Sequence, residues 1–441
     1  MDRREFLARQ LGAALLAGDW TAEALLARTE QVLGPSTQMS QRRLVRYLLK
    51  GAATSYPPAP DRLATVLLTS NWFDRASGPL FRNPALVRAV LEPAKFAPSL
   101  RFVGLDVPPI ATPGDLAHWF EIAIRHLDWF ADSRRQAHAT DIPILQNYAY
   151  AFLPKKNGPP RLIEQPKPAL KAVQKRILRE ILDQVPQHDC AHGFISGRSC
   201  ISSAEIHTGE ALVVTVDLKD FFLTTPLRRV HGLFRSLGYP WAVARLLTGL
   251  CSTATPLSVF QRLPPVRRHA WQTRKLYQSP HLPQGAPTSP ALANLAAWRL
   301  DARLSGLARS FDVHYTRYAD DLAFSGDKKF AHRVNGFLAA VESIAVAEGY
   351  ALNTRKTRIM PRAACQRITG LVVNDHLNVS RAAYDALRAI LHNCAKNGPV
   401  LENRSAHPNF QAHLEGRVGW VENVNPARGQ RLRNLFDRVR W

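Results

Sequence analysis

The sequence predicts an α+β protein in which a mixed region is flanked by helical segments. Short β-rich apolar runs, such as residues 212–216, fall within residues 140–375. Before and after this region, leucine and alanine recur every three to four residues, which is the spacing of amphipathic helices. A chain of 441 residues is long enough for two or three domains, each with its own core.

Charge is the most unusual property of the composition. The 58 Lys and Arg exceed the 35 Asp and Glu and leave a net charge of +23. A surplus of this size favours a polyanionic partner, nucleic acid first, and weighs against an enzyme of small cationic substrates. Composition alone does not separate nucleic-acid binding from enzymatic action on nucleic acid.

The five cysteines and the hydropathy indicate a cytoplasmic protein. The cysteines form no CxxC pair, and the group made by His188, Cys190, His192 and Cys200 is spaced irregularly for zinc. No apolar run approaches the length of about 20 residues that spans a membrane. The start of the chain resembles a twin-arginine export signal, but Leu7, Leu11 and Leu15 repeat as in an amphipathic helix. We therefore expect no membrane partner.

The chain divides into four predicted segments. Residues 1–110 form a helical extension of unknown role, interrupted by a turn at 55–60, and residues 111–139 contain a connecting helix. The mixed α/β region covers 140–375, and residues 376–441 are helical again.

Acidic residues at strand ends carry the strongest chemical signal. The run 212–216 predicts a strand buried on both faces that ends at Asp217. Residues 313–325 predict a hairpin with Asp320 and Asp321 at its turn. Such strand ends can gather three carboxylates, the oxygen ligands that hard cations prefer. Either acidic segment alone is equally compatible with a solvated turn.

Three ordered motifs resemble those of reverse transcriptases. Tyr318-Ala-Asp-Asp321 resembles their YADD box, and Val216-Asp-Leu-Lys-Asp-Phe-Phe222 resembles the motif with the first metal-binding aspartate. Gln284-Gly-Ala-Pro-Thr-Ser-Pro290 is similar to the loop-to-helix motif between them. The resemblance covers residues 140–441 and implies a right-hand polymerase with fingers, palm and thumb, preceded by the helical extension. It also implies RNA-directed DNA polymerase activity.

The resemblance assigns catalytic roles to four side chains. Asp217, Asp320 and Asp321, with the backbone of Leu218, are expected to hold two Mg²⁺ ions, with Mn²⁺ as an alternative. Lys356, in a motif expected near the leaving pyrophosphate, is a candidate general acid.

Other motifs imply nucleotide contacts. Phe222 is expected to exclude a ribose 2′-hydroxyl, although it or Phe221 could simply be a core residue. Gln284 and Gly285 would approach the incoming dNTP. Lys155 and Arg161 would hold the triphosphate, with Lys156 nearby on the same basic hairpin, which could otherwise be a solvated turn. Ser289 is predicted to cap a helix that continues past Leu304.

Basic and polar residues are assigned to RNA binding. A stripe with a spacing of four residues predicts a track for the template backbone, although such stripes are usually solvated faces. Three further RNA-binding residues come from the two short elements described in the next paragraph. The predicted RNA-binding residues are Lys167, Lys171, Lys175, Arg179, His207, Thr369 and Gly370.

Two short elements are similar to those of bacterial retron enzymes. Ser203-Ala-Glu-Ile-His207 is similar to the retron Asn-Ala-x-x-His element, with Ser in place of Asn, and Ile368-Thr-Gly370 to their Val-Thr-Gly. This resemblance implies a structured non-coding RNA as template, priming from an RNA 2′-hydroxyl, a DNA product joined to RNA (msDNA), and anti-phage defence with an effector protein. The alternatives are another defence-associated or group II intron-like reverse transcriptase, or a catalytically idle RNA-binding scaffold.

Overall fold

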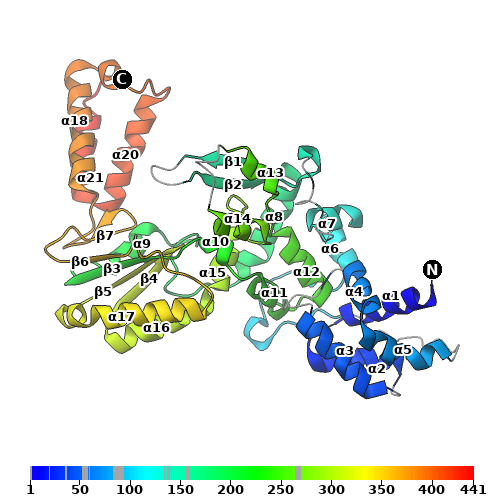
Figure 1. Ribbon diagram of the computed structural model, residues 1–441. Coiled ribbons are helices and arrows are strands. Elements are labelled where there is room, and N and C mark those ends of the chain that lie inside the picture. Colours follow the sequence, from blue (N-terminus) through cyan, green and yellow to red (C-terminus); the bar gives the residue numbers. More distant parts are fainter. Residues whose placement is uncertain are drawn as a thin grey trace. The chain divides into compact units, whose positions relative to one another are not determined.

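The computed structural model describes residues 2–18, 20–34, 37–51, 58, 60–82, 94–133, 136, 140, 142–154, 159–263 and 270–441. The chain forms two compact units, and each is built from two segments. The first unit contains residues 1–186 and 222–296, and the second contains residues 187–221 and 297–441 (Figure 1). The segment boundaries at 110, 139 and 375 remain predictions.

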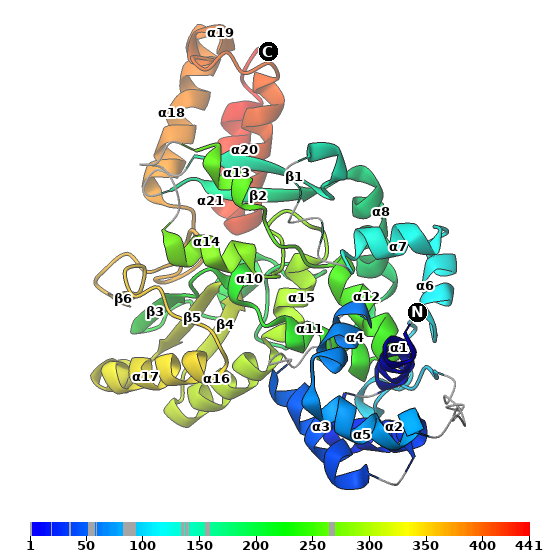
Figure 2. The same ribbon diagram turned by 45° about the vertical axis from the view of Figure 1, so that its right-hand side comes forward.

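The first unit begins with a bundle of five helices, coloured blue in Figure 2. The bundle has a single apolar core to which Leu11, Leu44 and Phe73 contribute. The helical prediction is therefore confirmed for the described residues up to 82, whereas residues 94–110 contain only the short 3-10 turn at 100–102. Most of the turn at 55–60 lies outside the described residues. The helices are α1 (Arg3–Leu16), α2 (Ala22–Leu33), α3 (Gln38–Gly51), α4 (Pro60–Leu68) and α5 (Asn71–Arg82).

The start of the chain, which resembles an export signal in sequence, forms helix α1 of this bundle. Arg4 donates to both carboxylate oxygens of Asp74, and Leu11 and Leu15 are buried in the bundle. Within the described residues, no helix has the length and apolar character needed to cross a bilayer.

The rest of the first unit contains a two-stranded antiparallel hairpin and several helices. Its strands β1 (Tyr148–Leu153) and β2 (Arg161–Pro166) pair from Tyr148–Pro166 to Leu153–Arg161. The connecting helix is broken into two, since Glu121 adopts a φ of 59° after the first of them. The helices are α6 (Pro113–Trp119), α7 (Ile124–Phe130), α8 (Pro168–Glu180), α11 (Leu227–Ser236), α12 (Trp241–Leu250), α13 (Leu257–Gln261), α14 (Trp271–Gln278) and α15 (Ser289–Ala296), with 3-10 turns η2 (Leu100–Phe102), η3 (Pro143–Leu145) and η4 (Leu182–Gln184).

A four-stranded antiparallel sheet in the order β4-β5-β3-β6 organises the second unit. The central strand β3 (Leu212–Asp217) is buried along almost its whole length, as predicted. Its neighbours are β5 (Asp321–Gly326) and β6 (Arg358–Pro361), and β4 (His314–Tyr318) forms the outer strand beside β5. Helices α16 (Trp298–Phe311) and α17 (Lys328–Ala347) pack on the sheet, and α9 (Cys200–Glu205) packs on β4.

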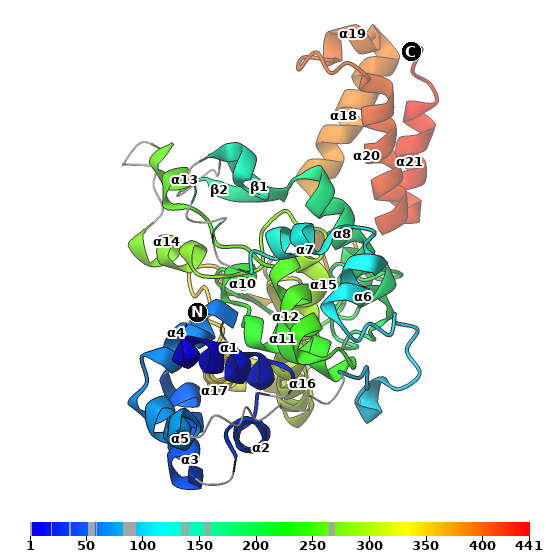
Figure 3. The same cartoon turned by 90° about the vertical axis from the view of Figure 1, so that its right-hand side faces the viewer.

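The second unit ends in a hairpin and a helical bundle. Strands β7 (Arg367–Ile368) and β8 (Leu371–Val372) pair around a tight turn. Figure 3 shows the long helices α18 (Arg381–Asn397), α20 (Phe410–Val424) and α21 (Pro426–Phe436) side by side, with the short α19 (Pro399–Glu402) between the first two in sequence. Leu387, Leu391, Leu432 and Phe436 are buried between them, which confirms the predicted C-terminal helices.

Candidate active site

Strand pairing in the second unit brings the predicted carboxylates together. Asp217 is the last residue of β3 and lies directly opposite Asp321, the first residue of β5. Directly opposed side chains on antiparallel strands have Cβ atoms about 5 Å apart. Asp320 is in the two-residue turn between β4 and β5, so all three acids lie at one end of the sheet.

Backbone hydrogen bonds fix this end of the sheet. The Leu218 N–H donates to the Asp320 carbonyl (2.8 Å), which ties the acidic turn to the chain that leaves β3. The Asn353 N–H donates to the Asp217 carbonyl (2.8 Å) from the other side. The positions of the carboxylates therefore follow from the main chain of three neighbouring segments.

Lys356 forms an ion pair with one of these acids. Its Nζ donates to Asp217 Oδ2 at 2.6 Å. Burial alone would lower the pKa of Lys356, but the hydrogen bond to Asp217 and the charges of Asp217, Asp320 and Asp321 raise it. This contact shows that the acidic cluster attracts a cation, and it places Lys356 at the cluster. The general-acid role of Lys356 remains a prediction.

The pKa of Asp321 is raised by its surroundings. Partial burial, together with the charges of Asp320 and Asp217, raises the pKa of Asp321 to about 6, and Lys356 opposes this shift. Mutual repulsion of this kind is typical of carboxylates that are assembled to hold cations. The donor set of three acids at one end of the sheet thus fits hard divalent ions.

The raised pKa of Asp321 predicts how stability depends on pH. Because its carboxyl ionises less readily in the folded state, the free energy of unfolding should fall as the pH rises from the ordinary pKa of 3.8 to about 6. Asp321→Asn should remove this loss and stabilise the metal-free protein at pH 7 by about 1 kcal/mol, a figure discounted for solvent screening. Urea unfolding at pH 4 and pH 7 measures the difference. Asp106→Asn, at an exposed position of the other unit, is the control, and an equal gain in both variants would contradict the prediction.

A buried ion pair holds the turn that carries Asp320 in place. Arg317 on β4 donates to both carboxylate oxygens of Asp301 on α16, at 2.8 and 2.6 Å, and both side chains are inaccessible to solvent. The third guanidinium nitrogen donates to the Ala319 carbonyl at 3.1 Å. Ala319 has a φ of 56°, a left-handed conformation that costs energy for a residue with a side chain. The ion pair therefore fixes the turn that carries Asp320.

Gly193 allows another segment to approach the same turn. The chain at 190–192 runs parallel to β4 and exchanges hydrogen bonds with both backbone groups of Arg317. A Cβ atom at Gly193 would lie 2.7 Å from the Ala319 nitrogen, so only glycine fits there. Neither Gly193 nor the pair Asp301–Arg317 was predicted. The available signals were an Asp in a predicted helix and an Arg in a β-rich run. No local sequence pattern indicates that these two residues pair.

His207 is wrongly predicted as a direct RNA contact. Its side chain is fully buried, and its two ring nitrogens pair with the hydroxyls of Ser325 (2.7 Å) and Thr316 (2.8 Å). Burial, with the nearby His314 and His192, lowers the pKa of His207 to about 3, so the ring is neutral. His207 thus connects α9 to both strands of the acidic hairpin, and Ser203 on α9 adds a bond to Thr316 (3.0 Å).

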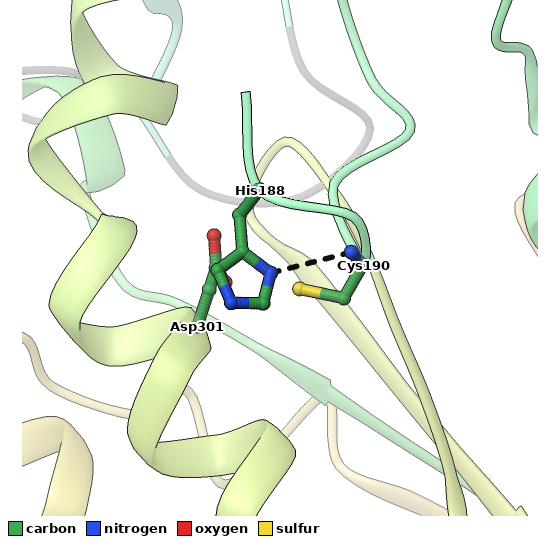
Figure 4. Close-up of side chains that lie close together, drawn as sticks. All are labelled: His188, Cys190 and Asp301. Carbon is green, nitrogen blue, oxygen red and sulfur yellow. Dashed lines mark hydrogen bonds between the residues drawn. The ribbon is translucent and has the colours of Figure 1, made fainter. Parts of the chain in front are cut away.

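His188, Cys190 and Asp301 form a cluster of potential metal ligands (Figure 4). The Cys190 N–H donates to His188 Nδ1 at 3.3 Å. However, both oxygens of Asp301 accept from Arg317, whose positive charge would oppose a cation. Burial also raises the pKa of the Cys190 thiol, which disfavours the thiolate that zinc requires. These three side chains are therefore better explained as part of the packed interior than as metal ligands.

In the first unit, the predicted nucleotide loop packs against β2. The Glu164 N–H donates to the Gln284 carbonyl at 2.9 Å. Gly285 has a φ of 142°, and a Cβ atom there would lie 2.8 Å from the Glu164 carbonyl oxygen. The glycine is thus required by the close approach of the loop to the strand.

A buried network behind this loop holds it in place. Glu164 accepts from Thr255 (2.5 Å) and from Nε2 of His281 (2.8 Å), three residues before Gln284. Burial alone would lower the pKa of His281, but the charge and hydrogen bond of Glu164 raise it. The prediction that Ser289 caps a helix is wrong, because helix α15 already includes Ser289 and its hydroxyl donates to the Pro283 carbonyl (2.7 Å). The predicted single helix is also two, α15 and α16.

The remaining nucleotide-binding predictions fall on the first unit. Phe221 is buried whereas Phe222 is half-buried, so one phenylalanine of the pair is a core residue and the other is partly accessible. Arg161 is exposed at the start of β2. Lys155 and its neighbour Lys156 lie outside the described residues. These nucleotide contacts stay predictions.

The predicted basic stripe lies on α8. Lys171 and Lys175 line a shallow groove of about 350 Å³ together with Gln165 and Pro168. Lys167 differs from the others, because its Nζ donates to the Pro143 and Ile144 carbonyls and so belongs partly to the local structure. Arg179 is exposed in the last turn.

Thr369 and Gly370 form the turn between β7 and β8. Both have positive φ values, 49° and 88°, the combination that two-residue hairpin turns require. Thr369 is strained in this conformation, and its hydroxyl donates to the Cys200 carbonyl at the start of α9 (3.2 Å). This bond ties the turn to α9, the helix in which the element that starts at Ser203 begins. An RNA contact at Thr369 or Gly370 stays a prediction.

The comparisons with known proteins agree with this geometry. The model of the family described as reverse transcriptase (RNA-dependent DNA polymerase) matches residues 153–373, half of the chain. The chain belongs to the reverse transcriptase family. The matched residues include all three aspartates, the loop at Gln284 and the turn at Thr369. The match confirms the predicted fold class.

Several similar curated proteins are retron reverse transcriptases, which confirms the resemblance to this branch. Retron Mx65 reverse transcriptase of Myxococcus xanthus is 40% identical over 65% of this chain and 64% of its own length. Retron Mx162 reverse transcriptase of the same organism is 37% identical over 71% and 64%. Retron Ec86 reverse transcriptase of Escherichia coli is 29% identical over 79% and 96%. This chain thus spans 64% of the length of the two Myxococcus relatives.

Among solved structures, a foamy viral protease-reverse transcriptase in complex with double-stranded DNA aligns with 55% of this chain and 32% of that chain. The sequence identity is 16% and the TM-score is 0.29.

Proposed function

We propose that this reverse transcriptase is an RNA-directed DNA polymerase of retron type that copies a structured RNA into single-stranded DNA. The observation that carries the proposal is the pairing of Asp217 with Asp321 beside the turn residue Asp320. An idle RNA-binding scaffold would have no use for three mutually repelling carboxylates, one of which has its pKa raised to about 6.

The side chains provide a binding site for divalent ions and nucleotide phosphates. Asp217, Asp320 and Asp321, with the Leu218 backbone, would hold two Mg²⁺ ions. When bound, such ions activate the attacking hydroxyl and stabilise the charge of the leaving pyrophosphate. The sheet and the Arg317–Asp301 pair keep the carboxylates in position before binding, which lowers the reorganisation that the reaction requires.

Three residues are proposed to contact the dNTP. Gly285 allows a close approach of the loop backbone, and Arg161 offers a planar fork for phosphate oxygens. Phe222 would exclude the 2′-hydroxyl. In the second unit, Lys356 would move from Asp217 towards the pyrophosphate when cations bind the cluster.

The retron-specific part of the proposal concerns template and priming. We infer priming from a 2′-hydroxyl of the partner RNA, a product in which DNA is joined to RNA, and a role in anti-phage defence with an effector protein. The similarity to retron reverse transcriptases and the contact between α9 and the turn at Thr369 support this assignment.

Two experiments test the function. Purified protein with an RNA template, an annealed primer, dNTPs and Mg²⁺ should extend the primer, and omission of Mg²⁺ or of the template should stop synthesis. Absence of template-dependent extension would contradict the polymerase assignment. Nucleic acid that copurifies should contain RNA and DNA joined by a bond that a debranching enzyme cleaves; RNA alone would contradict the retron assignment while leaving the polymerase intact.

Phe222→Ala is expected to admit ribonucleotides. Removal of the ring leaves space for a 2′-hydroxyl, so incorporation of rNTPs relative to dNTPs should rise about 10²-fold. Single-nucleotide extension with each substrate measures this ratio. Phe222→Tyr keeps the bulk and should retain discrimination; unchanged selectivity in the alanine variant would refute the steric role.

A further inference from the structure

The N-terminal bundle carries an exposed basic face on α3 and α5. Helix α3 contains four cations and no acidic residue, whereas each of α1, α2, α4 and α5 contains at least one acid. Its apolar side packs into the bundle core through Leu44, Val45 and Leu48. The cations all lie on the opposite, exposed side: Arg42, Arg43, Arg46 and Lys50.

The cations of α3 form a row rather than a scattered set. Arg42, Arg46 and Lys50 follow one another at intervals of four residues, which places successive side chains about 6 Å apart along one helix face. The row spans about 12 Å, close to the length of three to four nucleotides of one strand.

Aromatic residues contact two arginines of this face and add exposed ring surface to it. The guanidinium carbons of Arg43 and of Arg75 on α5 lie 4.9 and 5.0 Å from the centroid of the Trp72 ring. A guanidinium that rests on an aromatic ring is oriented while its N–H donors remain available for phosphate oxygens. Tyr47, 38% exposed, adds a ring to the same face of α3.

The basic side chains of this face are available for an external anion. Among the ion pairs of the described residues, none involves a cation of α3 or Arg75, whereas Arg4 and Arg9 of the same bundle pair with Asp74 and Glu5. Uncompensated charge on one face of a folded domain destabilises it through self-repulsion unless a polyanion binds there.

We propose that the α3–α5 face of the N-terminal bundle is a nucleic-acid-binding surface that holds a phosphodiester backbone. The row of cations would contact successive phosphates, and the Trp72-supported Arg43 and Arg75 would give bidentate contacts. Such contacts position a strand without reading its sequence. The proposal goes beyond the polymerase function and does not depend on it, since the surface would bind whether or not the chain synthesises DNA.

Arginine labelling of the full-length protein tests the surface directly. A hairpin RNA, the same hairpin as DNA, and vesicles containing phosphatidylserine are each added before reaction with phenylglyoxal, and labelled arginines are identified by mass spectrometry. Protection of Arg43, Arg46 and Arg75 by either nucleic acid supports the proposal, and the stronger protector identifies the source of the backbone. Unchanged labelling with both nucleic acids, or protection by vesicles alone, overturns it.

A pair of variants adds a quantitative test. Arg43→Gln/Arg46→Gln should weaken binding of the hairpin RNA at least fivefold, on the order expected for two lost phosphate contacts, and reduce the slope of log affinity against log salt by about 1.5. The control Arg62→Gln/Lys329→Gln removes the same charge from exposed positions on α4 and α17. An equal loss of affinity in both double variants would show that only net charge matters. An unchanged salt slope in the Arg43/Arg46 variant would show that these arginines do not contact phosphates. Either result overturns the proposal. Equal melting temperatures of the two variants establish that both are folded.

Discussion

Asp320→Asn is expected to abolish DNA synthesis while leaving the fold and RNA binding nearly intact. The amide keeps the size of the side chain but removes the negative charge with which it would hold a divalent ion. Because the turn is fixed by backbone contacts, Leu218 N–H to the Asp320 carbonyl among them, the substitution should leave the sheet in place. The rate of primer extension should fall by at least about 10³-fold.

The measurement is single-turnover extension with saturating dNTP and Mg²⁺. Asp375→Asn, which removes an exposed acid of the same unit, should extend at the normal rate. Affinity for a hairpin RNA, followed by fluorescence anisotropy, should agree within about a factor of two between the two variants and the parent protein, because neither substitution changes the buried core. Persistent synthesis by the Asp320 variant would rule out the metal assignment.

Asp301→Ala should be among the most destabilising single substitutions in the chain. It leaves the guanidinium of Arg317 buried without its carboxylate partner, a change that typically costs about 3–5 kcal/mol. Tyr315, whose hydroxyl donates to Asp301 Oδ1 at 2.9 Å, would lose its acceptor as well. The free energy of unfolding in urea measures the effect.

A double variant separates stability from turn positioning. Asp301→Leu/Arg317→Met replaces the ion pair by apolar side chains, which commonly restores stability. The double variant still lacks the Arg317 hydrogen bond to the Ala319 carbonyl, which holds the turn that carries Asp320. Its rate of DNA synthesis should therefore be about 10- to 100-fold below that of the parent protein, as for lost supporting contacts at metal sites. A double variant with normal stability and a normal rate would show that Arg317 does not position the turn.

The parts of the site that sequence analysis predicted share one property, which is that a local pattern encodes them. An apolar run that ends in Asp217 and a β-rich stretch interrupted by Ala319-Asp320 each specify a strand and its end, and antiparallel pairing then brings the acids together. The helices of the N-terminal and C-terminal segments were equally predictable, since their buried leucines repeat with the helical period.

The parts that were missed depend on contacts between residues far apart in the chain. Arg317 finds Asp301 across the packing of β4 on α16, and Gly193 is required only because a separate segment runs beside β4. His207 was recognised as part of a motif but given the wrong role, because its burial is decided by Thr316 and Ser325, more than 100 residues later. Pairings of this kind appear only after the chain has folded.

The division of each unit into two chain segments has a consequence for biogenesis. The polypeptide leaves the second unit immediately after Phe221 and returns to it at Ala297, between α15 and α16. The strand that ends in Asp217 must therefore wait for the synthesis of at least residues 321–326 before its principal partner exists. At translation rates of about 5–20 residues per second, this apolar strand would stay unpaired for several seconds or longer. Newly made chains are thus expected to depend on chaperones more than a protein with sequential domains, and aggregation on rapid overexpression would arise from this strand.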